Sequence, residues 1–312
     1  MKDSFFAEVD TAHLSMSYSD KAFTISSAHL VRLAEQCHYR LTGDIVLFGI
    51  RAAESLSERG QWLTEIRIAE KELDYAHLNC LLGLWDRKNY KIAVFQGSTV
   101  PFVANLMKQR EHPNQRISNQ LVQGLYQYYV GAHEPDNRPK EEGAFRLTRH
   151  ISTPVWRDYG DDHVVLDACT PNDHIHAAGS IDTDYKSAGC QVIAGFHDEL
   201  MPTGEYQQFR VLAGQSALPS ELELHLPYQY LLTHARHLHA IQQGFSVERL
   251  MQGSEGYWVR KLQEQLISEN YLFEPKIDKG LMDGETIKAV YEWQKACNYI
   301  ADGIHRIESF KL

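Results

Sequence analysis

The most informative prediction that this sequence makes rests on two stretches, Ile175–Gly179 (Ile-His-Ala-Ala-Gly) and Ser187–Ile193 (Ser-Ala-Gly-Cys-Gln-Val-Ile). They place His176 fourteen positions before Cys190. The Val-Ile pair that ends the second stretch indicates a buried strand, so the thiol is expected at a strand end, facing a cleft. A cysteine attacks as the thiolate, and a neighbouring imidazole promotes its ionisation and carries the proton. The spacing therefore indicates a cysteine nucleophile with a histidine base.

These two stretches resemble the signature of the L,D-transpeptidases, a family of cell-wall enzymes. That signature is a histidine in an Ile-His-Gly-like segment followed by Ser/Thr-x-Gly-Cys, and His176, Ser187, Gly189 and Cys190 match it. The resemblance implies a mostly β catalytic domain in which a peptidoglycan stem peptide acylates Cys190 and His176 is the base. It also implies that Gln191, next to the nucleophile, contacts the substrate. We expect Ser187 to hold the turn, and backbone N–H groups around Gly189 and Cys190 to stabilise the oxyanion.

Three sites depart from that signature. Ala177 stands where the family has glycine after the histidine, and Ala188 stands where it often has histidine before the Gly-Cys pair. Gln191-Val192 follow the cysteine, where the family favours arginine or asparagine. These departures keep open a different class of protein, a non-catalytic wall-binding protein with a decayed enzyme domain.

A second, independent resemblance lies near the C-terminus. The segment Gly253–Leu266 is similar to the first helix of a small peptidoglycan-binding module, whose sequence runs Gly-x-x-Val-x-x-Leu-Gln-x-x-Leu. The rest of that module is matched by Asp283-Gly284, Thr286, Ala289-Val290, Gln294 and Ala301–Ile304. The resemblance implies binding of peptidoglycan glycan strands, and we expect Tyr257, Trp258 and Trp293 to contact them. The alternative is that these aromatic side chains fill a small core.

Periodicity indicates a helical fold for this tail without reference to the resemblance. Apolar residues recur at three- and four-residue spacing in two segments, Val259, Leu262, Leu266 and Ile267 in the first and Ile287, Val290 and Tyr291 in the second. Such spacing is typical of amphipathic helices. Asp283 and Thr286 are expected to cap the second helix.

Length and charge limit the class of protein. The 312 residues, 43% of them hydrophobic, are enough for about two domains with a packed core. The formal net charge of −10 argues against a general nucleic-acid surface, which needs clustered lysine and arginine. The sequence has no run of about eighteen apolar residues, so we expect no membrane span. We expect no cofactor, and the composition leaves the oligomeric state open.

The N-terminal sequence Met1–Asp10 lacks the charged, apolar and small-residue zones of a secretory signal peptide. The five cysteines form an odd set without Cys-x-x-Cys spacing, which fits free thiols in a reducing cytoplasm. We therefore expect a protein made in the cytoplasm that reaches the cell wall or periplasm by a dedicated route. An effector delivered into other bacteria and a prophage lysis product both fit this expectation.

The order of the expected elements predicts an α+β chain with a mostly β catalytic domain and a small all-α C-terminal domain. Residues 26–37 have helical spacing, and segments 44–50, 91–95, 124–130 and 163–169 have the composition of strands. A polar, proline-bearing loop is expected over 133–143. The predicted domains are a helical lead-in over 1–40, an L,D-transpeptidase-like domain over 41–215, a helical connector over 216–245 and a peptidoglycan-binding domain over 246–312.

The 16 histidines support one further alternative, a zinc-dependent peptidoglycan peptidase. Zinc accepts imidazole and carboxylate ligands, and the sequence offers two His-x-His pairs with two nearby aspartates: His174 and His176, His237 and His239, Asp182 and Asp184. Each aspartate misses by one position the place that such peptidases use, so we predict no bound metal. Apart from His176, these histidines also fit ordinary surface or hydrogen-bonded side chains.

Overall fold

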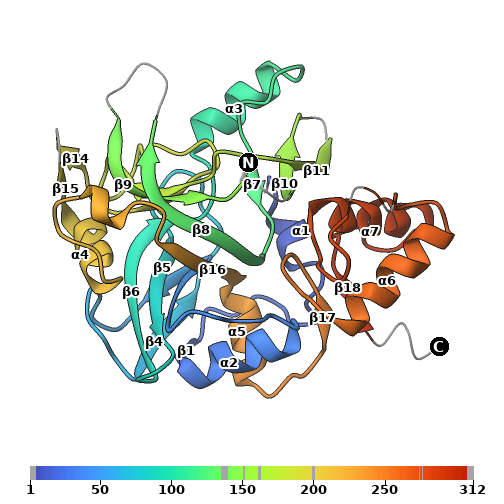
Figure 1. Ribbon diagram of the computed structural model, residues 1–312, viewed down its shortest axis with the longest axis horizontal. Coiled ribbons are helices and arrows are strands. Elements are labelled where there is room, and N and C mark those ends of the chain that lie inside the picture. The colour runs from blue at the N-terminus through green and yellow to red at the C-terminus, as the bar shows by residue number, and fades with distance from the viewer. Residues whose placement is uncertain are drawn as a thin grey trace.

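The computed structural model describes residues 5–134, 140–149, 152–160, 163–198, 201–273, 275 and 277–307. The chain is a mixed α+β protein, mostly β, built around a closed eight-stranded barrel (Figure 1). The strands follow one another around the barrel in the order β12 (Ile175–Ala177), β13 (Gln191–Ile193), β6 (Lys91–Ser98), β5 (Cys80–Asp86), β2 (Ile45–Arg51), β16 (Pro227–His234), β8 (Gly124–His133) and β9 (Glu141–Leu147). The structure confirms the predicted fold class, α+β with a mostly β main part.

Two strand pairs of the barrel are parallel. β12 pairs in parallel with β13, and β2 with β16, while the other neighbours run antiparallel. Two adjacent parallel strands need a crossover connection, which returns the chain to the end of the sheet where the first strand begins. Residues 178–190 form that connection between β12 and β13, and it brings Cys190 back beside the start of β12.

Alternate side chains of the strands fill the barrel interior. Leu47, Phe95 and Tyr230 are fully buried there. α4 (Gly204–Leu212) adds Phe209 to this core, together with Tyr206, whose hydroxyl donates to the carbonyl oxygen of Ile175 at 3.2 Å. The side chain of Tyr206 therefore supports, from this core, the strand that carries His176.

A second core covers the outer side of several barrel strands. Phe48 and Ile50 of β2 pack there against α2 (Ser27–Gln36) and α5 (Ala235–Gln242). The same core includes side chains of a small sheet in the order β1 (Ala22–Ser26), β4 (Glu65–Glu70) and β3 (Ala53–Ser55). Figure 1 shows α2 and α5 together at the lower end of the barrel. Both faces of β2 and of its neighbour β5 are covered, which fits the mostly apolar sequences of these two strands.

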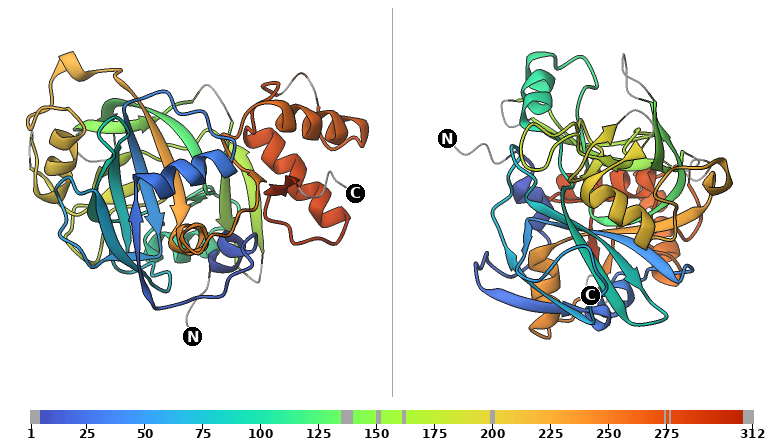
Figure 2. Two further views of the ribbon diagram at one scale, coloured as in Figure 1. Left: turned by 90° about the horizontal axis from the view of Figure 1, so that it is seen from below. Right: turned by 90° about the vertical axis from the view of Figure 1, so that its left-hand side faces the viewer.

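The C-terminal helices α6 (Tyr257–Ser268) and α7 (Gly284–Ala296) lie at one side of the barrel (Figures 1 and 2). They pack on a sheet in the order β11 (Val164–Cys169), β10 (Thr153–Asp158) and β7 (Gln120–Leu121), where the rings of Trp156 and Tyr291 are 5.7 Å apart. A ladder between β17 (Arg249–Leu250) and β18 (His305–Arg306) joins the two ends of this helical unit. The remaining elements are α1 (Ala7–Thr11), α3 (Val103–Glu111), the 3-10 helix Glu221–Glu223, β14 (His197–Asp198) and β15 (Met201–Pro202).

Several local predictions are confirmed. The helix expected over 26–37 is α2, the two C-terminal helices are α6 and α7, and the four expected strands are β2, β6, β8 and β11. Asp283 caps α7, since its carboxylate accepts a hydrogen bond from the backbone N–H of Thr286 at 2.8 Å. Thr286 is therefore the residue whose N–H is capped. No helix of the described residues is long and apolar enough to cross a bilayer.

The prediction of a helical connector over 216–245 is wrong in its central part. Residues Pro227–His234 form β16, a barrel strand between β2 and β8, and the helix α5 begins only at Ala235. Leu231 packs outside the barrel while Leu232 packs inside it. A strand buried on both faces lacks the apolar-polar alternation of a half-exposed strand, so periodicity alone does not distinguish it from a buried helix. The boundary expected at 215 therefore cuts through the barrel.

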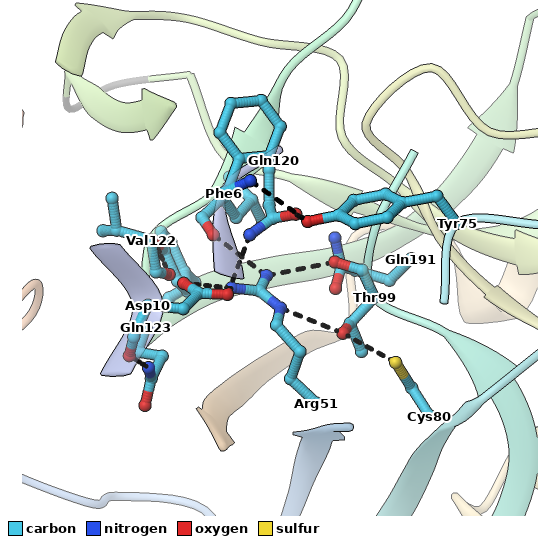
Figure 3. Close-up of polar contacts among 12 residues, drawn as sticks. Phe6, Asp10, Arg51, Tyr75, Cys80, Thr99, Gln120, Val122, Gln123 and Gln191 are labelled. Carbon is cyan, nitrogen blue, oxygen red and sulfur yellow. Dashed lines mark hydrogen bonds and ion pairs between the residues drawn. The ribbon is translucent and has the colours of Figure 1, made fainter. Parts of the chain in front are cut away.

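The described residues of the helical lead-in expected over 1–40 also belong to the main body. β1 pairs with β4, and Asp10 of α1 forms a buried ion pair with Arg51 of β2, with 2.8 Å between the carboxylate oxygen and guanidinium Nη1. The Arg51 guanidinium also donates to the backbone oxygens of Thr99 and Leu121, both at 3.0 Å. Figure 3 shows Arg51 at the centre of these contacts. The network anchors α1 to the barrel.

Candidate functional site

The site is centred on two adjacent parallel strands. Ile175 of β12 is in register with Gln191 of β13, and His176 with Val192. Cys190 stands two positions before Val192, the register partner of His176. Because side chains alternate between the two faces of a sheet, Cys190 and His176 lie on the same face. Cys190 and Val192 belong to a small core outside the barrel, whereas Ile175 and Ile193 point into the barrel interior. The strand register therefore places the thiol diagonally across from the imidazole.

A second histidine joins this pair. One potential ligand atom from each of His133, His176 and Cys190 lies within 4.8 Å of the other two. The rings of His133 and His176 are stacked, with centroids 4.2 Å apart and an interplanar angle of 10°. His176 and Cys190 are buried and His133, at the end of β8, is half-buried. The three side chains thus form one compact cluster, which we call the Cys-His-His cluster.

Glu141 and the backbone of Ala177 place two acceptors beside Nδ1 of His176. The Oε2 atom of Glu141 lies 3.5 Å from Nδ1 of His176, and the backbone oxygen of Ala177 lies 2.8 Å from the same nitrogen. Both neighbours are acceptors, so we assign the ring proton to Nδ1. Nε2 then carries the lone pair, as a general base requires. A carboxylate beside Nδ1 also stabilises the imidazolium that forms when Nε2 takes a proton.

Hydrogen bonds hold the turn that carries Cys190. The hydroxyl of Ser187 donates to the backbone oxygen of Cys190 at 2.7 Å and accepts from the N–H of Gly189 at 3.2 Å. The thiol itself donates to the backbone oxygen of Asn172 at 3.3 Å. Ser187 therefore holds the turn in the way the sequence predicts. The Gly189 N–H, expected as an oxyanion donor, is instead engaged by Ser187, because the hydroxyl of that residue folds back over the turn.

Behind this turn lies a buried carboxyl group. The amide of Asn119 donates to the Asp173 carboxyl group, and a Cβ at Gly189 would lie 2.5 Å from Oδ1 of Asp173. Gly189 is therefore needed for close packing. Burial raises the pKa of Asp173 to about 7, against the opposing effects of the Asn119 hydrogen bond and the charge of Arg157.

This raised pKa predicts how stability depends on pH. A carboxyl group whose pKa is higher in the folded than in the unfolded state stabilises the fold while it is protonated, and that stability is lost as pH rises from about 4 to about 7. Asp173→Asn, which is neutral throughout, is expected to be more stable than the parent at pH 8 by roughly 2–4 kcal/mol, and about equal to it at pH 4. Urea unfolding of both proteins across this range measures the difference. Parallel pH profiles would contradict the prediction.

Gln191 does not reach this face. Its side chain is fully buried, where its amide donates to the backbone oxygen of Gly189 at 3.1 Å and its Oε1 accepts from the hydroxyl of Tyr230 at 3.0 Å. The expectation that Gln191 contacts substrate therefore does not fit the structure. The reason is strand alternation: the residue after Cys190 points to the opposite face of β13.

The structure separates the two His-x-His pairs. His237 and His239 lie on α5, where the ring of His237 is 5.5 Å from that of His13 and the ring of His239 stacks on Phe23 at 4.5 Å. Among the described residues, the Cys-His-His cluster is the group of three potential ligands close enough to share a metal ion. The ligand set considered from the sequence therefore does not assemble, because β12 and α5 lie in different parts of the fold.

The three aromatic residues of the C-terminal unit have different settings. Tyr257 is 57% exposed, whereas Trp258 and Trp293 are partly buried against the core beneath α6 and α7. The ring of Trp293 lies 5.6 Å from that of Tyr299 and 6.1 Å from that of His305. Trp258 and Trp293 thus serve the core at least in part, as the alternative interpretation expects, and Tyr257 is the most accessible of the three.

The residues that carry the C-terminal resemblance form a network of side-chain hydrogen bonds within the C-terminal unit, which we call its polar frame. The Gln294 side chain donates to Asp302 Oδ1 at 3.0 Å and accepts from the N–H of Gly303 at 2.8 Å. The Gln263 side chain donates to Thr286 Oγ1 at 3.1 Å. These motif residues therefore hold α6, α7 and the last loop together.

Sequence reasoning missed His133 and Glu141. Both fall in the predicted loop over 133–143, but β8 runs to His133 and β9 begins at Glu141, while residues 135–139 lie outside the described residues. The two are direct partners in the antiparallel ladder, so their side chains share a face. The local signal for these two residues is a hairpin with a polar residue at the end of each strand. Nothing in that pattern indicates that they lie beside His176.

No family model, curated protein or solved structure matches this chain. The structure defines the class as a mixed α+β protein with an eight-stranded barrel and a Cys-His-His cluster beside β12 and β13. The chemistry of that cluster is therefore the basis for assigning a function.

Proposed function

We propose that this protein is a cysteine-dependent acyl transferase that acts on peptidoglycan stem peptides, as an L,D-transpeptidase or as an L,D-carboxypeptidase or endopeptidase. The observation that carries the proposal is the convergence of Cys190 and His176 from neighbouring strands, with Glu141 next to Nδ1 of the histidine. A nucleophile, a base and a group that orients the base are the three parts that nucleophilic catalysis needs.

The proposed acylation begins with proton transfer. Nε2 of His176 takes the thiol proton of Cys190, and the hydrogen bond from Sγ to the backbone oxygen of Asn172 is broken. The thiolate then attacks the carbonyl carbon of the stem-peptide bond. The C–N bond breaks, the acyl group stays on Sγ as a thioester, and the imidazolium returns its proton to the amine that leaves. Glu141 stabilises the imidazolium between these two proton transfers.

Deacylation decides the product. An amine of a second stem peptide attacks the thioester and gives a cross-link, whereas water gives net hydrolysis. In either case His176 takes a proton from the attacking group and returns one to the sulfur. For oxyanion stabilisation the N–H of Gly189 would exchange its hydrogen bond to Ser187 for one to the tetrahedral intermediate.

The C-terminal unit supports a role in wall binding. Its resemblance to peptidoglycan-binding modules extends over the polar frame formed by Gln263, Thr286, Gln294 and Asp302. Tyr257, exposed at the start of α6, offers an aromatic surface for a sugar ring. We place the activity at the cell wall or in the periplasm, because its substrate polymer lies there.

Mass spectrometry of purified tetrapeptide and cross-linked muropeptides incubated with the protein tests this function. We expect loss of D-alanine, cleavage or new cross-links with the parent and with a chelator-treated sample, a thioester on Cys190, and no turnover with Cys190→Ala. Cys169→Ala is the matched control, since Cys169 is a partly buried thiol held near Arg157 on β10.

Each contrary outcome points to another class of protein. Full turnover by Cys190→Ala would end the cysteine mechanism. Turnover that the chelator abolishes would indicate a metal peptidase, and binding without turnover would indicate a non-catalytic wall-binding protein.

A further inference from the structure

We propose that the Cys-His-His cluster also binds one Zn²⁺ ion, and that this ion switches the nucleophile off. The regulatory part of this inference rests on the proposed function, whereas the metal site stands on the side chains alone. His133, His176 and Cys190 each bring a ligand atom to within 4.8 Å of the other two. Thiolate sulfur and imidazole nitrogen are preferred ligands of Zn²⁺, and three protein ligands leave a fourth position for water.

The surroundings of His176 suit a metal ligand. Its Nδ1 atom is 2.8 Å from the backbone oxygen of Ala177 and 3.5 Å from the carboxylate of Glu141. Histidines that bind metals commonly donate their second ring N–H to a carbonyl or carboxylate, which fixes the tautomer and strengthens the ligating nitrogen. Nε2 of His176 is then the ligand atom.

His133 is the residue that distinguishes a metal site from a simple nucleophile–base pair. The proposed acyl transfer uses Cys190, His176 and Glu141, and it assigns no proton transfer to His133. Yet the ring of His133 lies 4.2 Å from that of His176, in the same compact cluster as the thiol. A third ligand at this position turns a two-ligand contact into the three-ligand set of an exchangeable zinc site.

Binding requires a small rearrangement. Stacked rings have lone pairs in parallel planes, so one ring must turn before both nitrogens can bind the same ion. His133 is half-buried at the end of β8, whereas His176 is buried and held on Nδ1, so the ring of His133 is the one that turns. Bond lengths of about 2.0–2.1 Å to nitrogen and about 2.3 Å to sulfur then hold the three ligand atoms within the 4.8 Å that already encloses them.

The bound ion blocks both partners of the acyl-transfer pair. Zn²⁺ replaces the thiol proton of Cys190, and that proton passes to the solvent without any change in oxidation state. The sulfur lone pair and the Nε2 lone pair of His176 are then both committed to the metal. The thiolate no longer attacks a carbonyl, and the imidazole no longer accepts a proton. The metal-free protein is therefore the active form.

Cobalt substitution tests the site without depending on turnover. Full-length protein carrying Cys297→Ser, which removes an exposed thiol, is stripped of metal, titrated with Co²⁺ and followed by its thiolate-to-cobalt charge-transfer absorption. We expect one equivalent of Co²⁺ to give this absorption and Zn²⁺ to displace it. The absorption is expected to disappear in Cys190→Ser and to persist in Cys169→Ser.

His133→Phe tests the third ligand, because phenylalanine keeps a flat ring over His176 and supplies no nitrogen. We expect its affinity for Co²⁺ and Zn²⁺ to fall at least about tenfold. In muropeptide turnover, Zn²⁺ is expected to inhibit the parent at stoichiometric concentration, and a chelator to restore its activity. His133→Phe should need at least about tenfold more Zn²⁺ to halve its own metal-free rate.

The outcomes separate the two proposals. No charge-transfer absorption, or an affinity unchanged in His133→Phe, overturns the metal site. Absorption without turnover in any metal state supports the site and overturns the acyl-transfer function. Turnover only in the zinc-loaded protein overturns the inhibitory role and makes the ion a cofactor.

Discussion

Replacing His176 with alanine is expected to lower kcat/KM for stem-peptide acyl transfer by about 10²–10⁴-fold, the usual contribution of a positioned general acid–base group. Without the imidazole, the thiol of Cys190 must ionise against the hydrogen bond that it donates to Asn172. The leaving amine also loses its proton donor. Both steps of the thioester pathway are therefore slowed by one substitution.

The rate of Cys190 alkylation by iodoacetamide measures the first of these effects separately from turnover. Across pH 5–9 we expect the parent to react faster than His176→Ala at every pH below the ordinary thiol pKa of about 8.5. His174→Ala is the matched control, because His174 is equally buried and stands two residues earlier in the same segment. It should retain turnover within a few-fold. Equal alkylation rates and equal turnover in parent and His176→Ala would remove His176 from the mechanism.

The second large effect concerns stability. Asp10→Ala is expected to lower the free energy of unfolding by about 3–5 kcal/mol, since it leaves the charge of Arg51 buried without its partner. The side chains of Arg51 and Asp10 are 0% and 2% exposed. Although burial opposes the charged guanidinium, the carboxylate of Asp10 raises the pKa of Arg51, so the arginine stays charged in the folded state.

Urea unfolding at pH 7 measures this loss. The surface pair of Lys71 and Glu54, at 43% and 51% exposure, supplies the control, and Glu54→Ala is expected to cost less than about 1 kcal/mol. The double variant Asp10→Leu/Arg51→Met removes both charges and should be more stable than Asp10→Ala alone. A loss in Asp10→Ala no larger than that in Glu54→Ala would show that the buried network does not anchor α1.

The parts of the fold that the sequence predicts correctly depend on residues close together in the chain. Helices α2, α6 and α7 repeat apolar residues at helical spacing, and Asp283 caps α7 from three residues before Thr286. The prediction of a helix fails at strand β16, because its adjacent leucines, Leu231 and Leu232, pack on opposite faces. The sequence of a helix or strand shows an apolar periodicity only where one face of the element is exposed to solvent and the other is buried.

The candidate site likewise has one part that the sequence predicts and one part that it does not. Cys190 and His176 are joined by one short connection, so their spacing along the chain is enough to indicate the pair. His133 and Glu141 reach the pair through the hairpin of β8 and β9, and a single ladder contact, Ile175 with Phe145, brings that hairpin beside β12. His133 and Glu141 join the site only through that strand pairing, and no local pattern in the sequence indicates it.

The α+β character, the amphipathic helices and the thiol–imidazole pair follow from the amino-acid sequence alone, because each depends on neighbours within a few turns or one connection. Three other features depend on tertiary contacts: β16 completes the barrel, Gln191 points into its interior, and His133 joins the cluster while His237 does not. These features depend on which strands pair and in what register. Register is selected by the packing of both sheet faces against distant segments, and a shift of one residue would turn every side chain to the opposite face.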